Sequence, residues 1–223
     1  MKDIFRYLGT LTFIFFISSC AEKAIESDVA VWLTNLDESA LFEKQQGTLV
    51  FEALDNSLPI INVDPTQSFQ TMDGFGFSLT GGSAMVINRM NSDNRAKLLK
   101  ELFDTDHNNI GISYLRISIG ASDLNDHVFS YNDLPDGETD VELDNFSIDE
   151  DKKDLIPVLK EILAINPNIK LMGSPWSAPK WMKTNNDTKG GSLKPEFYKT
   201  YSNYFVKYIQ NMKEEGIMLD AIT

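Results

Sequence analysis

The stretch IKLMGSPWSAPKWMKTN, residues 169–185, joins a short apolar segment to a loop rich in tryptophan and proline. We expect residues 169–173 to form a strand, because the run is short, apolar and ends at a glycine. The loop presents the flat faces of Trp176 and Trp181 on a backbone restrained by two prolines. Such a loop suits a sugar ring, although both tryptophans could instead be core residues.

Beyond residue 80, segments with strand and helix patterns alternate, which indicates a parallel sheet covered by helices. The expected strands are residues 75–79, 112–119, 169–173 and 217–223. Helices are expected from a cap at Asn91 to about residue 103, from a capping box at Ser147 to about residue 165, and from Pro195 to a stop at Gly216. The last helix carries an aromatic stripe that we expect to pack in the core.

The expected fold class is α/β, a (β/α)8 TIM barrel in which residues 67–223 form the first half and which is truncated after about four strands. Residues 29–66 contain short β-rich pieces, including residues 49–51 and 60–63, and are expected to be strands of a flanking β domain. A complete open sheet of the flavodoxin type is the alternative, but no glycine-rich phosphate loop supports it.

The N-terminus has the pattern of an export signal, with Lys2 and Arg6 before an apolar run. Residues 1–19 are expected to be a signal peptide of the lipoprotein type, and residues 20–28 a tether. The tetrapeptide Ile-Ser-Ser-Cys that ends at Cys20 resembles a bacterial lipobox, which implies lipidation of Cys20 and an exported, membrane-anchored protein facing the periplasm or the cell surface. An ordinary signal peptide with an incidental cysteine is the alternative.

Composition excludes several kinds of site. The chain of 223 residues carries a net charge of −13, which disfavours nucleic acid as a partner. Its single cysteine excludes an internal disulfide and a cysteine-based metal centre, and its two histidines are too few for a histidine-rich one. We expect no metal and no cofactor, and carboxylate chemistry is the natural candidate.

Four motifs, in order along the chain, resemble those of the family-30 glycoside hydrolases of clan A, which include glucosylceramidases and endo-β-1,6-glucanases. The motifs are QTMDGFG at residues 70–76, LRISIGASD at 115–123, SPWSAPKWMKTN at 174–185 and GSLK at 191–194. The resemblance implies a (β/α)8 barrel with a β-sandwich flank, and it agrees with the β-rich N-terminal region.

The resemblance also implies retaining hydrolysis of a β-glucosidic bond by two glutamates held about 5 Å apart. By the family pattern these glutamates are expected beyond Thr223, the acid/base in an Asn-Glu-Pro motif and the nucleophile on a later strand. We therefore expect this polypeptide to be inactive by itself. A glycan-binding lipoprotein that lacks catalysis is the alternative.

Three residues carry substrate-binding roles by resemblance. Asp123 is expected to accept hydrogen bonds from sugar hydroxyls, Trp176 to shape the same pocket, and Arg116 to contact the nucleophile and lower its pKa. The alternatives are a loop cap for Asp123 and a structural charge pair for Arg116. Trp181 receives no role, and Lys183 is expected to be a solvated rim residue.

The substrate stays open at the level of the sequence. Residues 77–83, FSLTGGS, lack the aspartate that many family members have at this point, so the segment looks less like that of the animal glucosylceramidases. The expected partner is a β-glucoside, either a polysaccharide or a glycolipid, and the only expected contact with a membrane is through the lipid anchor.

Overall fold

The computed structural model of this chain describes residues 27–53, 57–106 and 109–223, which fall into two units divided after Gln67. The expected signal peptide, the lipobox with Cys20 and almost all of the tether lie outside the described residues. Among the described helices, none combines the length and the apolar character needed to cross a bilayer.

The N-terminal unit contains two short antiparallel strands, β1 (Trp32–Leu33) and β2 (Glu43–Lys44). The expected strands at residues 49–51 and 60–63 are absent from the part of this unit that the structure describes, so that prediction is wrong. Side chains there face solvent, Phe51 at 82% and Ile61 at 90% exposure. A β-rich composition produces a strand only where a neighbouring strand pairs with it and a surface covers it.

The second unit is built on a parallel sheet in the order β3 (Gly76–Leu79), β4 (Tyr114–Ile119), β5 (Lys170–Pro175) and β6 (Ala221–Ile222). This is the partial (β/α) barrel expected from the alternating pattern. Strand β6 is shorter than expected and pairs only with Met172 and Gly173 of β5.

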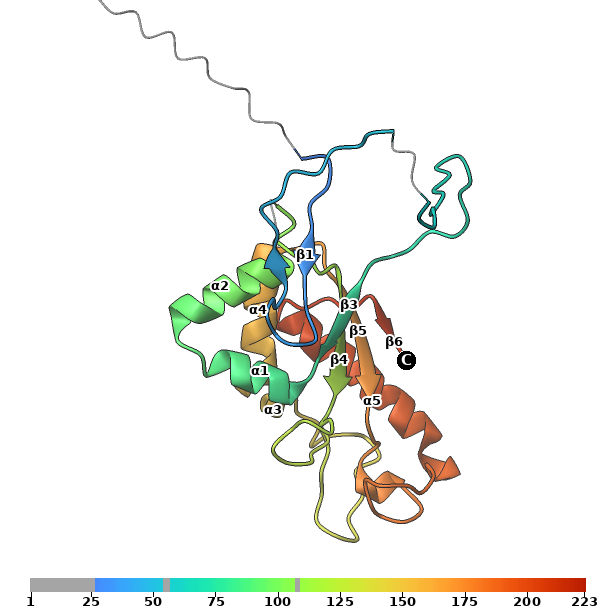
Figure 1. The fold of residues 1–223 in the computed structure, drawn as a ribbon. Helices are drawn as coiled ribbons and strands as arrows, with labels where there is room; N and C mark the ends of the chain where they lie inside the picture. Colours follow the sequence, from blue (N-terminus) through green and yellow to red (C-terminus); the bar gives the residue numbers. More distant parts are fainter. Residues whose placement is uncertain (1–26, 54–56, 107–108) are drawn as a thin grey trace, which may run out of the picture. The chain divides into compact units, whose positions relative to one another are not determined.

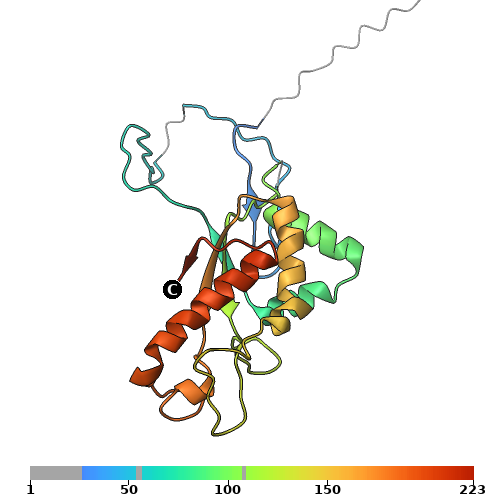
Figure 2. The same ribbon diagram turned by 180° about the vertical axis from the view of Figure 1, so that it is seen from behind.

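Helices connect the strands. They are α1 (Gly81–Asn88), α2 (Ser92–Phe103), α3 (Asp149–Lys153), α4 (Leu155–Ile165) and α5 (Tyr198–Glu214), with 3-10 turns η1 (Lys180–Met182) and η2 (Pro195–Phe197). Figures 1 and 2 together show α4 and α5 crossing one face of the sheet.

Two predicted helix starts have different outcomes. The cap at Asn91 is confirmed, because its side chain accepts a hydrogen bond from the Asn94 N–H. The helix predicted from Ser147 is instead two helices that break at Asp154, where φ is −136°. The Ser147 hydroxyl accepts from the Asp149 N–H, so it makes a local turn rather than the expected capping box.

The core depends on alternation along β4. Leu115, Ile117 and Ile119 are at most 1% exposed, whereas Arg116 between them is exposed on the opposite face. The predicted aromatic stripe of α5 is confirmed, since Tyr204 and Tyr208 are buried in the same cluster. Each fully buried side chain of this size contributes about 1.5–3 kcal/mol relative to exposure, so the helix-covered face holds the sheet.

A carboxyl group lies inside this apolar layer. Asp151 of α3 is 4% exposed and accepts a hydrogen bond of 2.5 Å from the Tyr131 phenol. The ring of Tyr131 stacks on those of Tyr204 and Tyr208, with centroids 5.8 and 5.3 Å apart. Burial raises the pKa of Asp151 to about 7, against the lowering effect of the Tyr131 hydrogen bond.

The variant Asp151→Asn tests this assignment. The folded protein holds the proton of Asp151 up to about pH 7, whereas the unfolded chain releases it near pH 3.8, so the free energy of unfolding falls as pH rises between these values. The variant lacks this titration, and above pH 7 it should be more stable than the parent, by up to about 4 kcal/mol.

Thermal unfolding of the parent and the variant between pH 4 and 8 measures the difference in their free energies of unfolding. Subtracting one curve from the other removes the contributions of other groups that titrate in the same pH range. Parallel curves for the two proteins across that range would show that Asp151 is ionised in the fold.

Candidate functional site

The expected binding residues follow neighbouring strands at one edge of the sheet. Strands β4 and β5 are parallel, and Ile119 is in register with Pro175, so both strands end at the same level. Asp123 lies shortly after β4, and Trp176 directly follows β5. Figure 1 shows the two loops together beyond the arrowheads of these strands. This carboxyl edge is where barrel enzymes carry their chemistry.

Arg116 occupies the centre of β4 on the face opposite the helices. Its guanidinium donates to the Ser174 hydroxyl of β5 at 2.9 Å and to the Ser78 hydroxyl of β3 at 3.3 Å. It makes no ion pair with a carboxylate in the part of the chain that the structure describes. The structural charge pair considered for Arg116 is therefore not found there, and the charge remains available to an anionic group.

The hollow beside Arg116 has a volume of about 330 Å³ and is lined by β3, β4 and β5, including Gly76 and Tyr114. A Cβ at Gly76 would lie 1.4 Å from the Tyr114 carbonyl oxygen. The second glycine of the Gly-Phe-Gly motif is thus required by close approach of two strands rather than by a turn.

Asp123 stands at the tip of a tight turn whose bonds are made by its neighbours. The Asn125 side-chain oxygen accepts from the Ser122 N–H and hydroxyl, and the Asn125 N–H donates to the Ser122 carbonyl. The exposed carboxylate of Asp123 takes no part in these bonds. The loop-capping alternative is accordingly not seen, and the side chain is directed to solvent at the carboxyl edge.

Helix α1 supports this turn through two glycines. A Cβ at Gly82 would lie 1.6 Å from the Leu124 carbonyl oxygen, and one at Gly81 would lie 2.4 Å from the Asn125 side-chain nitrogen. Thr80 before them caps α1 by accepting from the Ser83 N–H. The segment that lacks the family's aspartate therefore positions the Asp123 turn by backbone approach, a role that sequence reasoning missed.

The two tryptophans of the second loop differ in their surroundings. Trp181 is 7% exposed; its indole N–H donates to the backbone and side-chain oxygens of Asn132, and its ring meets Phe197 edge-on at 4.9 Å. Trp176 is only partly buried, two residues beyond the Ser174 that Arg116 contacts. Trp181 is thus a core residue, as the alternative for the tryptophans held, whereas part of the Trp176 side chain is accessible to a ligand.

The loop that carries Asp123 is tied down at two successive residues. The Tyr131 N–H donates to the Tyr204 hydroxyl of α5, and the Asn132 side chain donates to Asp140. Burial raises the pKa of Asp140, but hydrogen bonds from Asn145, Asn132 and the Asp144 N–H outweigh it and bring the pKa to about 2. The carboxylate of Asp140 is therefore ionised and organises the turn that follows.

Lys183 is not the solvated rim residue that was expected. It is 7% exposed, and its ammonium donates to the Ser177 hydroxyl and the Thr188 carbonyl. Burial lowers the pKa of this lysine. The residue joins the two ends of its own loop, and its place in the sequence did not indicate this because the acceptors come from the loop's folded shape.

The structure links the three expected residues unequally. Arg116 reaches Ser174 and so approaches Trp176 along β5, whereas Asp123 forms no hydrogen bond or ion pair with either residue in the described part of the chain. Sequence reasoning missed Ser78 and Ser174 as partners of Arg116. On β3 the exposed Ser78 stands next to the buried Leu79, which is a signal that could have identified it, whereas Ser174 is itself 8% exposed and no such alternation marks it. No group of three potential metal-ligating side chains occurs among the described residues.

Comparison with known proteins adds to this geometry. The family model "Glycosyl hydrolase family 30 TIM-barrel domain" matches residues 72–223. Lysosomal acid glucosylceramidase of Mus musculus is 33% identical over 171 residues, which cover 74% of this chain and 32% of that protein. Endo-1,6-beta-D-glucanase of Neurospora crassa is 34% identical over 175 residues, which cover 75% of this chain and 36% of that protein. The chain thus spans about a third of the length of these curated relatives.

Solved structures give the same picture. An endo-β1,6-glucanase superimposes with a TM-score of 0.69 at 36% identity, covering 89% of this chain and 42% of that one. SrfJ from Salmonella typhimurium superimposes with a TM-score of 0.66 at 33% identity, and the match covers 71% of this chain and 35% of that one. In both comparisons the likeness in structure covers at least 71% of this chain.

The variant Gly82→Ala tests the support of the Asp123 turn. Helix propensity alone favours alanine by about 1 kcal/mol. The clash with the Leu124 carbonyl, however, forces the turn or the helix to move, and we expect the melting temperature to fall by about 4 °C or more. Hydrogen exchange measured by mass spectrometry should also accelerate in residues 120–126.

The matched control is Gly47→Ala, because a Cβ at Gly47 meets no atom within 4 Å. We expect this control to leave both the melting temperature and the exchange of residues 120–126 unchanged. A Gly82→Ala protein that is more stable than the parent would contradict the assignment.

Proposed function

The chain belongs to glycoside hydrolase family 30, and we propose that the protein hydrolyses β-glucosidic bonds with retention of the anomeric configuration. The observation that carries the proposal has two parts: Asp123 and Trp176 follow β4 and β5 at the carboxyl edge of a parallel sheet, and Arg116, at the centre of β4, has no carboxylate partner among the described residues. Retention requires two carboxyl groups about 5 Å apart. We propose that the two glutamates lie beyond Thr223, as the family pattern implies.

Asp123 supplies specificity for the sugar in this proposal. An ionised carboxylate accepts hydrogen bonds from hydroxyl groups more strongly than a neutral acceptor does. A sugar that lacks those hydroxyls would leave the carboxylate without its partners and would bind less well. The turn made by Ser122 and Asn125 holds Asp123 in place without occupying its oxygens.

Arg116 and Trp176 supply the electrostatics and the wall of the same site. The guanidinium of Arg116 has two N–H groups engaged by serine hydroxyls, which fix its direction without neutralising it. A positive charge beside a carboxylate nucleophile lowers the pKa of that nucleophile and keeps it ionised. The partly buried indole of Trp176 offers an apolar face against the C–H face of the sugar.

The substrate is a β-glucoside of a polysaccharide or of a glycolipid. The relative named as an endo-1,6-β-glucanase is 34% identical to this chain, and the relative named as a glucosylceramidase is 33% identical. Overall sequence identity therefore does not separate the two substrate classes. Activity on β-1,6-glucan and on glucosylceramide should therefore be measured side by side, with an aryl β-glucoside as the common reference.

The test is the hydrolysis of an aryl β-glucoside by the full-length protein and its Asp123→Asn variant. Loss of the charged acceptor should lower kcat/KM by about 30- to 100-fold. Proton NMR of the reaction should show the β-anomer of glucose before the α-anomer. The matched control is Asp126→Asn, since Asp126 is exposed on the same loop and pairs with His127 rather than facing a ligand. Its kcat/KM should not change.

Two results would oppose the proposal. An α-anomer formed first would mean an inverting mechanism. Tight glycan binding without turnover by the full-length protein would favour the glycan-binding lipoprotein over the enzyme.

We also propose that the protein is exported and anchored through a lipid on Cys20, facing the periplasm or the cell surface. The pattern of residues 1–20 supports this location. Metabolic labelling with a radioactive fatty acid should mark the parent and not the Cys20→Ser variant, which should leave the membrane fraction. Equal labelling of both proteins would rule out this anchor.

A further inference from the structure

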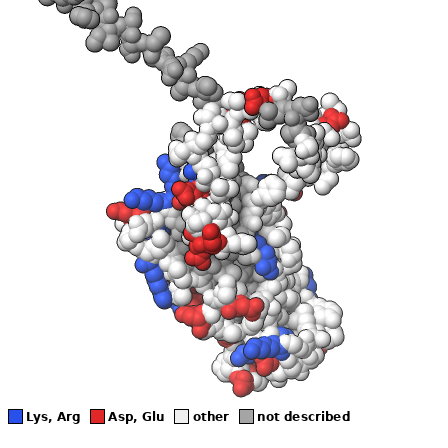
Figure 3. All heavy atoms as spheres, in the orientation of Figure 1, with Lys and Arg blue, Asp and Glu red and all other residues white. Residues whose placement is uncertain are grey.

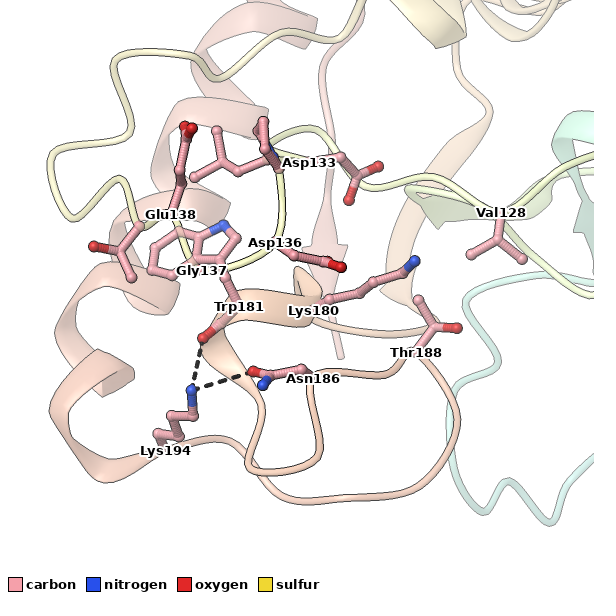
Figure 4. A pocket seen from close by; sticks show the side chains of 13 residues that line it. Val128, Asp133, Asp136, Gly137, Glu138, Lys180, Trp181, Asn186, Thr188 and Lys194 are labelled. Carbon is pink, nitrogen blue, oxygen red and sulfur yellow. Dashed lines mark hydrogen bonds between the residues drawn. The ribbon is translucent and has the colours of Figure 1, made fainter.

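A second concavity lies farther along the two loops that carry Asp123 and Trp176. It has a volume of about 570 Å³ and is enclosed by residues 128–139 on one side and residues 180–194 on the other (Figure 4). Small-molecule sites commonly span roughly 300–1,000 Å³. The hollow is therefore large enough for a ligand, and neither Asp123 nor Trp176 lines it.

The walls of this pocket are held by internal contacts. Both carboxylate oxygens of Asp133 accept from Ser130, by way of its N–H and its hydroxyl, each at 2.7 Å. The ammonium of Lys194 donates to the Trp181 carbonyl at 3.1 Å and to the Asn186 side chain at 3.4 Å. These groups set the shape of the pocket and leave little hydrogen-bonding capacity for a ligand.

Asp136 and Lys180 differ from these groups because neither side chain makes a hydrogen bond or an ion pair among the described residues, although the charge of Lys180 helps to lower the pKa of Asp187. Both are exposed and both line the pocket, and Figure 4 shows them on the two different loops. No hydrogen bond or ion pair of either side chain occurs within the described residues. A ligand between them would meet a free acceptor on one side and a free donor on the other.

The charge of the lining selects the class of ligand. Three acids, Asp133, Asp136 and Glu138, face two lysines, Lys180 and Lys194, and Figure 3 shows acidic and basic side chains interspersed on the face it presents rather than gathered by sign. An anion would be repelled by the acids and a cation by the lysines. A neutral molecule with many hydroxyls can donate to the Asp136 carboxylate and accept from the Lys180 ammonium.

We propose that this pocket is a second carbohydrate site, which holds a sugar residue of a glucan chain other than the residue held by Asp123 and Trp176. The inference rests on the proposed function, because the same two loops would then carry both sites. A chain of several sugars would occupy the two sites together, whereas an aryl glucoside would occupy only the first.

The kinetic experiment compares two substrates of the full-length protein. Asp136→Ala and Lys180→Ala should each lower kcat/KM on β-1,6-linked glucan by about tenfold, because each removes a hydrogen bond of a charged group to the distal sugar. On an aryl β-glucoside both variants should match the parent. Equal activity of the variants and the parent on both substrates, or equal losses on both, would overturn the proposal.

Matched controls come from the same two loops. Glu142→Ala removes an exposed acid, and Lys189→Ala removes an exposed lysine; neither residue lines the pocket. Both controls should retain full activity on the glucan. If these controls lost as much kcat/KM on the glucan as Asp136→Ala does, the loss would be an effect of removing any surface charge. That result would overturn the proposal.

A binding measurement separates this inference from the catalytic proposal. The chain has three tryptophans, and the indole N–H of Trp181 marks the second site while that of Trp176 marks the first. In NMR spectra of the indole-labelled protein, β-1,6-linked gluco-oligosaccharides should shift the Trp181 resonance in the parent and not in Asp136→Ala.

If this shift appears and no substrate is hydrolysed, the second site stands and the proposed activity fails. If hydrolysis proceeds and the Trp181 resonance stays in place, the second site is wrong and the activity stands.

Discussion

The burial of one face of a parallel sheet determines where every functional group of this protein lies. Leu115, Ile117 and Ile119 of β4 enter the layer formed with α4 and α5, and Arg116 must then face the other way because side chains alternate along a strand. A one-residue change of register would exchange the two sets and bury a guanidinium in an apolar layer. The cost of that exchange keeps β3, β4 and β5 aligned, and so keeps their carboxyl ends at one edge.

Long loops at that edge acquire order from polar groups rather than from regular structure. Tyr131 is held by Tyr204 through its backbone and by Asp151 through its phenol, while Asn132 receives the indole N–H of Trp181 and donates to Asp140. These bonds are buried, where an unpaired partner costs about 1–3 kcal/mol. The loop after β4 is therefore fixed against α3, α5 and the loop after β5, and the binding groups proposed for it lie on a rigid support.

Residues of the same type are divided between buried, structural positions and accessible ones. Trp181 and Lys183 are buried and hold the loop after β5 together, while Trp176 and Lys180 in the same loop keep accessible surface. On the other loop Asp140 is committed to backbone N–H groups, and Asp123 and Asp136 are not. This division leaves a few uncommitted groups among many fixed ones, which is the arrangement that selective binding of a polyhydroxylated ligand needs.

The sequence by itself determined the order of strands and helices in the second unit, the cap at Asn91, the aromatic stripe of α5 and the edge at which Asp123 and Trp176 lie, because these depend on periodicity and on neighbours in the chain. Only the tertiary structure decided that residues 49–51 and 60–63 form no strand, that the helix after Ser147 breaks at Asp154, that Lys183 is buried, and that Gly82 supports the Asp123 turn. The burial of Lys183 depends on the folded shape of its own loop, and the other outcomes depend on which segments approach one another in the fold. Local patterns encode neither.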